Sequence, residues 1–216
     1  MEKAESVNDC LLFSKKRLEE FKSLNNGDVS GTDPKFRQQL FREFFFHLVI
    51  AIELLTQAIN IARKIYIDAE DVSVKNVILK LDPNDSVRII LDKLHPKTRF
   101  EKIPRDPYSE EGCHFRILLY RNIVAYEMNF PFRFNLDVQS GKRTFNLLLD
   151  PRDKDTIASI KPGIEEMNYF WQLVNDKCQN IIALLPQDQP SNGLNGSAVF
   201  CLSSLFLLIY SLIMVR

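Results

Sequence analysis

The sequence of 216 residues has little cysteine, little histidine and no excess of charge of one sign. Its four cysteines lack a CxxC spacing, which argues against a disulfide framework and against a zinc site. Three widely separated histidines suggest no other metal site, so we expect neither a metal nor another cofactor. Basic and acidic residues number 28 each, so no global field draws the protein to nucleic acid or acidic lipid.

Familiar catalytic and targeting patterns are also missing. The chain contains no glycine-rich phosphate loop and no HExxH or GxSxG motif. Its start, MEKAESVND, is charged and lacks the apolar region of a secretory signal peptide, so we expect a cytoplasmic main domain. With 45% hydrophobic residues and 16 phenylalanines, the chain can build a core without disulfide or metal staples.

Hydrophobic periodicity predicts a mainly α-helical bundle. The longest helix begins at Asp33 and Pro34, an N-cap residue followed by proline at the first helical position, and its pattern continues to about Tyr66. A further helix is expected from Cys113 to Met128, packed along the longest one. Apolar residues at helical spacing predict other helices at about 7–24, 74–81, 87–94 and 162–185.

A different period follows residue 131. Apolar and polar residues alternate over 132–139 and again over 145–149, with Ser140 and Gly141 between them. This pattern predicts a small antiparallel β-hairpin at about 132–149. Two strands alone are marginally stable, so the apolar face of the hairpin must lie on the helices. The proline-containing stretch 95–112 is expected to be a surface loop.

Three segments are expected along the chain: a helical domain over 1–185, a flexible linker over 186–197 and an apolar tail over 198–216. The 18 residues of 198–215 carry no charge. As a helix they would span about 27 Å, the lower edge for a bilayer core of roughly 30 Å. We expect a C-terminal apolar helix that anchors the cytoplasmic domain to a membrane. A buried terminal helix and a disrupted reading frame are the alternatives.

Three polar residues interrupt the Cys113–Met128 helix, which is apolar on nearly every side and therefore expected to be buried. They are Arg121, Asn122 and Tyr126, the last two sharing a face because they are four residues apart. A buried guanidinium needs a partner, since an uncompensated buried charge is very costly. We expect the partner of Arg121 to be Glu53, in the apolar middle of the longest helix.

The run RNIVAYE resembles the signature helix of HEPN-superfamily proteins, small helical domains found with toxin–antitoxin, defence and RNA-cleaving systems. Their motif is an arginine, usually a polar residue such as asparagine, and a histidine some five positions on. Arg121 and Asn122 match this motif and Glu127 fits it, whereas Tyr126 stands at the position of the histidine.

The resemblance implies a homodimer in which arginine and histidine from two subunits cut RNA without metal by activating a 2′-hydroxyl. Histidine suits this role because its ordinary pKa is about 6.5, whereas that of tyrosine is about 10. We therefore expect a HEPN-like module with weak or absent ribonuclease activity that binds RNA or a protein partner. Its catalytic candidates are Arg121, Asn122 and Tyr126, supported by Glu53 and Glu127. An active ribonuclease and a non-catalytic, tail-anchored interaction or scaffold protein are the alternatives.

Overall fold

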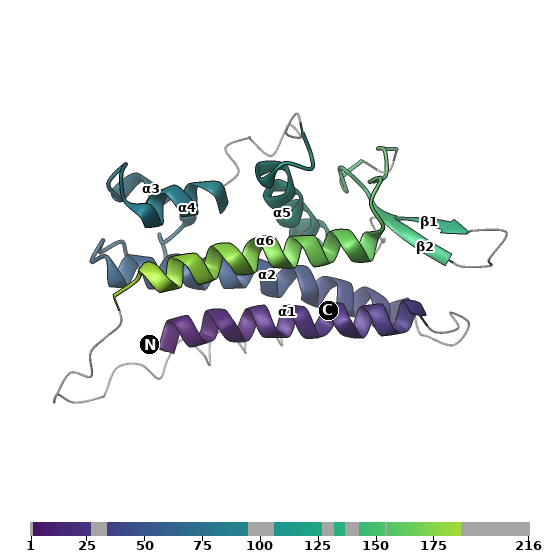
Figure 1. Cartoon of the computed structure of the whole chain (residues 1–216), viewed down its shortest axis with the longest axis horizontal. Helices are drawn as coiled ribbons and strands as arrows, with labels where there is room; N and C mark the ends of the chain where they lie inside the picture. Colours follow the sequence, from purple (N-terminus) through teal and green to yellow (C-terminus); the bar gives the residue numbers. More distant parts are fainter. Residues whose placement is uncertain are drawn as a thin grey trace. The chain divides into compact units, whose positions relative to one another are not determined.

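A computed structural model describes residues 2–26, 34–94, 106–126, 132–136, 143–153 and 155–186. Within these ranges the protein is mainly helical, with six helices and two short strands (Figure 1). The chain divides into two units, residues 1–186 and residues 187–216. Every element described here belongs to the first unit, and the predicted tail helix lies outside the described residues.

Two long helices, α1 (Glu2–Asn26) and α2 (Pro34–Ala62), lie side by side (Figure 1). Residues three or four apart give α2 a continuous buried face, formed by Leu40, Phe41, Phe44, Phe45, Leu48, Leu55 and Ile59. The buried hydroxyl of Ser14 on α1 donates a 3.0 Å hydrogen bond to the carbonyl of Phe44. The long apolar helix predicted from Pro34 is thus a core element.

The end of α2 is set by backbone geometry. The helix ends at Ala62, before the predicted end at Tyr66, because Lys64 and Tyr66 have φ angles of 51° and 60°. These left-handed values do not fit a right-handed helix. The side chain of Asn60 fixes the turn: its amide nitrogen donates to the carbonyl of Ile67 at 2.8 Å, and its amide oxygen accepts from the N–H of Ile67 at 3.1 Å.

By length and composition, α2 could also cross a membrane. Among the described residues, Lys35–Ala62 contains an 18-residue window of mean hydropathy 1.7, and 61% of that window is buried inside the protein. Core helices of soluble proteins pass the same test, so this finding is weak evidence for a membrane span.

Four further helices are α3 (Val74–Lys80), α4 (Ser86–Leu94), α5 (Glu110–Tyr126) and α6 (Gly163–Leu184). α5 begins before the predicted Cys113, because the hydroxyl of Ser109 accepts a 3.1 Å hydrogen bond from the N–H of Gly112. A glycine is required there, since a Cβ would collide with the backbone of Asp106 and Pro107. The predicted end of the helix at Met128 lies outside the described residues.

Strands β1 (Phe132–Leu136) and β2 (Arg143–Leu147) pair antiparallel, with Phe134 opposite Phe145. The turn expected at Ser140 and Gly141 lies outside the described residues, so the complete hairpin stays a prediction. β2 ends before the predicted Leu149, and the N–H of Ser159 donates to the carbonyl of Leu147 at 2.7 Å. The buried Phe145 ring lies against Gly163 at the start of α6, where any Cβ would overlap it.

The core joins α1, α2, α5 and α6. Tyr120 of α5 stacks on Phe45 of α2, with ring centroids 4.9 Å apart and planes 18° apart. The expected contact between the two helices is therefore present. The indole N–H of Trp171 in α6 donates a 2.9 Å hydrogen bond to the carbonyl of Leu11 in α1, which ties the first described helix to the last.

Candidate functional site

Arg121 meets the partner expected from the sequence. Its Nη2 lies 2.7 Å from Oε1 of Glu53, across the contact between α5 and α2. Its Nη1 donates to the side-chain oxygen of Asn122 at 3.2 Å. The predicted pairing of Arg121 with Glu53 is confirmed, and both nitrogens of the guanidinium fork face oxygen atoms of the protein.

The expected burial of this pair is wrong. The side chains of Arg121 and Glu53 are 32% and 48% exposed, so the pair lies at the edge of the α2–α5 contact. Periodicity misled here because it shows that α5 is apolar on several faces but does not show how far neighbouring elements cover each face, and Arg121 is only half-buried.

A buried ion pair joins α5 to α6. Nη1 and Nη2 of Arg116 lie 2.5 and 3.1 Å from the two carboxylate oxygens of Glu166, and these side chains are 0% and 2% exposed. Nη2 also donates to the carbonyl of Leu148 at 3.3 Å, and the hydroxyl of Tyr120 donates to the same carbonyl at 2.6 Å. Burial alone would lower the pKa of Arg116, but the hydrogen bonds and charge of Glu166 raise it.

Sequence reasoning missed Arg116 and Glu166, although a signal was present. Arg116 stands between Phe115 and Ile117 on the same apolar helix as Arg121, and Glu166 precedes the buried Met167. The argument that a buried guanidinium needs an oppositely charged partner applies to Arg116 as well as to Arg121. Only the position of α6 decides which of them is enclosed.

The other motif residues are only partly described. Asn122 is half-buried beside Arg121. Tyr126 is the last residue of α5, and neither its side chain nor Glu127 belongs to the described part of the chain. The structure therefore brings Arg121, Asn122 and Glu53 together and leaves the two remaining candidates untested.

Neither of the two described histidines fits the missing acid/base role. His114 lies two turns before Arg121 on α5, roughly 10 Å along the helix axis, and is 1% exposed. Burial lowers its pKa to about 4, and neither ring nitrogen has a hydrogen-bond partner among the described residues. His47 stacks on Phe13 with ring centroids 5.6 Å apart, and burial lowers its pKa too. His95 lies outside the described residues.

The described residues offer little support for a metal site or for a catalytic cysteine. No group of three or more histidine, cysteine, aspartate or glutamate side chains is placed there to hold a metal ion. Cys10, Cys113 and Cys178 are free thiols. Burial raises the pKa of Cys10 and of Cys113 to about 11 and that of Cys178 to about 12, so none of them is an activated nucleophile.

No protein-family model, no curated protein and no solved structure matches the chain. The HEPN resemblance therefore stays a prediction that rests on the sequence motif.

Proposed function

We propose that this chain is a HEPN-like helical module that holds an RNA or protein partner and does not cleave RNA at Arg121. The observation that carries the proposal is the 2.7 Å ion pair between Arg121 and Glu53. A phosphate bound by the guanidinium would have to displace this carboxylate and would be repelled by its negative charge. The motif arginine is thus compensated by the protein itself.

The residue at the histidine position of the motif supports the same conclusion. A tyrosine, with an ordinary pKa of about 10, exchanges protons poorly near neutral pH. Two residues would therefore prevent cleavage together. Tyr126 leaves the site without a general base, and Glu53 pairs with the guanidinium of Arg121. The family resemblance further implies that the module is a homodimer.

Cleavage of single-stranded RNA by purified variants tests the proposal. The wild-type protein should cut no faster than Arg121→Ala. The double variant Glu53→Gln/Tyr126→His frees the guanidinium and supplies an imidazole, so it should gain cleavage by a factor on the order of 10²–10⁴. Adding Arg121→Ala to the double variant should abolish that gain, which also excludes a contaminating nuclease.

Two outcomes would contradict the proposal. Cleavage by the wild-type protein that Arg121→Ala removes would make the chain an active ribonuclease. Absence of any gain in a folded, dimeric double variant would favour the second candidate, a non-catalytic scaffold unrelated to ribonucleases. Thermal unfolding and sedimentation of each variant provide the controls for fold and for dimer formation.

The proposal includes attachment to a membrane through residues 198–215, which carry no charge. The full chain should pellet with membranes and resist carbonate extraction, whereas a chain ending at Gln187 should stay in the supernatant after the same carbonate wash. Equal extraction of the two proteins would contradict a membrane-spanning tail.

A further inference from the structure

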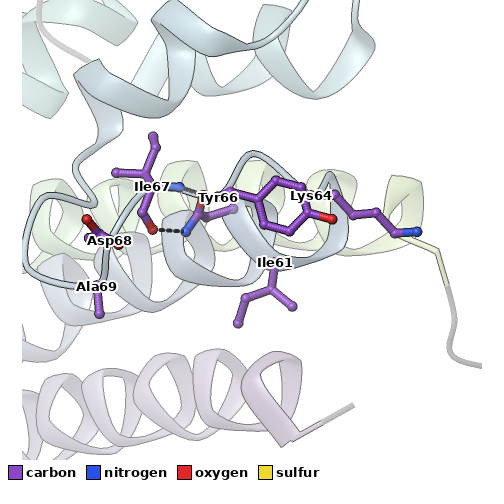
Figure 2. A pocket seen from close by; sticks show the side chains of 7 residues that line it. Ile61, Lys64, Tyr66, Ile67, Asp68 and Ala69 are labelled. Atoms are coloured by element: carbon purple, nitrogen blue, oxygen red, sulfur yellow. Dashed lines mark hydrogen bonds between the residues drawn. The ribbon is translucent and has the colours of Figure 1, made fainter.

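Large apolar side chains are exposed at more than one place on α1 and α2. At the C-terminal end of α2, Ile61 and Tyr66 line a shallow pocket of about 380 Å³ (Figure 2). Tyr66 is presented there by the turn that ends the helix, where its φ is 60°. Leu12 and Phe13, which are 67% and 48% exposed, lie instead in the middle of the regular 25-residue helix α1. No turn accounts for their exposure, and they are the starting point of the inference.

Phe13 belongs to a row of three rings that crosses from α1 to α2. Its ring stacks on that of His47, with centroids 5.6 Å apart and planes 28° apart, and His47 meets Phe46 edge to face at 5.8 Å. Phe46 and His47 are half-buried, so Phe13 is the most exposed member of the row. Rings held by such contacts lose little conformational freedom when a partner covers them, which favours association. We call Leu12, Phe13, Phe46 and His47 the α1 patch.

Two charged residues flank the exposed part of the α1 patch along the helix. Asp9 comes three residues before Leu12, and Lys16 comes three residues after Phe13. At this spacing the four side chains lie on one side of α1. Asp9 and Lys16 are exposed, and neither takes part in an ion pair among the described residues. The two apolar residues thus lie between an acidic residue and a basic residue.

This order of residues is complementary to itself when it is reversed. If a second α1 lies antiparallel on the first, with a two-fold axis between Leu12 and Phe13, Lys16 of each copy lies opposite Asp9 of the other. A parallel copy in the same register would place like charges opposite each other, which lowers affinity. The charges therefore favour one particular occupant in one orientation.

We propose that the α1 patch is the interface between two antiparallel copies of this chain. Burial of Leu12 and of the aromatic row supplies affinity, and the two Asp9–Lys16 pairs set the orientation. The inference rests on the homodimer of the proposed function and assigns that homodimer a surface.

Charge reversal tests this arrangement, with the full chain in a non-ionic detergent and dimer formation measured by sedimentation equilibrium. The wild-type chain should be a dimer. Asp9→Lys and Lys16→Asp each create two like-charged pairs across the interface, so each should weaken dimerisation roughly tenfold or more. Mixed in equal amounts, the two variants should form mixed dimers at close to the wild-type affinity, because each basic side chain then faces an acidic one. The double variant Asp9→Lys/Lys16→Asp should also dimerise.

The apolar part of the interface has a matched pair of variants. Leu12 and Leu79 are both 67% exposed, but Leu79 lies on α3, outside the α1 patch. Leu12→Ala removes an apolar side chain twice from a symmetric dimer and should weaken dimerisation roughly tenfold, whereas Leu79→Ala should leave it unchanged. All the substituted side chains are exposed, so the thermal unfolding of each variant should stay close to that of the wild-type chain.

A dimer that persists equally in every variant would overturn the inference and leave the homodimer of the proposed function intact, formed through another surface. A monomeric wild-type chain would overturn both the inference and the homodimer, and the α1 patch would then serve a partner of another kind. Failure of the two charge variants to associate when mixed would overturn the antiparallel arrangement. RNA cleavage that Arg121→Ala removes would contradict the proposed lack of activity, whatever the sedimentation result.

Discussion

Arg116 and Glu166 form a two-pronged ion pair inside the protein, whereas Arg121, five residues further along α5, makes a single contact with Glu53 of α2 at the surface. Both are arginine–glutamate pairs, but the first is buried and the second is partly exposed to solvent. This difference predicts opposite sensitivities to mutation.

Removing one partner of the buried pair should destabilise the protein severely. Arg116→Met leaves the Glu166 carboxylate uncompensated where almost no water reaches it. We expect a loss of about 3–5 kcal/mol in the free energy of unfolding, measured by urea denaturation. The double variant Arg116→Met/Glu166→Leu should recover much of that loss. Equal destabilisation by the single and double variants would show that packing, and not charge, dominates at this position.

Removing one partner of the surface pair should change stability little. Arg121→Ala and Glu53→Gln should each lower the free energy of unfolding by about 1 kcal/mol or less, because both side chains are substantially exposed. Added salt should shrink even this small difference. A loss near that of Arg116→Met would mean that the pair is a main support of the fold.

Acid should destabilise the protein through His114. Burial lowers the pKa of this histidine to about 4, Glu110 opposes that shift and Lys177 adds to it. Between an unfolded pKa of about 6.5 and the folded value, the unfolded chain binds the proton more tightly, so stability falls as the pH falls through this range. The full effect is on the order of 3 kcal/mol. His114→Leu should remove this component, and unfolding curves at pH 7 and pH 4.5 measure the difference.

Tight packing between β2 and α6 should make Gly163 intolerant of any side chain. In Gly163→Ala the new methyl group overlaps the Phe145 ring, and we expect a loss of about 1–3 kcal/mol. Phe145→Leu should destabilise the wild-type protein but lose less, or gain, in the Gly163→Ala background. A double-mutant cycle checks this coupling, and strictly additive effects would place the cause elsewhere.

Much of the architecture follows from local signals. Pro34 marks the start of α2, and the spacing of its phenylalanines gives the buried face. The end of α2 could not be predicted, because it depends on the Asn60 side chain bonding to Ile67 and on positive φ at Lys64. Residue propensities do not predict hydrogen bonds of this kind between a side chain and a backbone seven residues away.

Within the candidate site, the contact between Arg121 and Glu53 was predicted, but its exposure to solvent was not. Opposite charges at Arg121 and Glu53 on two apolar helices were enough to expect a pair. Burial depends on which neighbouring element covers each face of α5, and a single sequence does not give that arrangement. For the same reason the enclosed Arg116 was overlooked.

The hydrogen bond from Trp171 to the carbonyl of Leu11 bridges 160 positions of the chain. Forming this contact requires the closure of a long loop, which costs conformational entropy before the contact yields any stabilisation. During synthesis, α1 and α2 would wait with apolar surface uncovered until α6 has left the ribosome, the stage at which nascent chains depend on chaperones. Trp171 is the only tryptophan in the sequence, so its fluorescence reports when this final closure occurs.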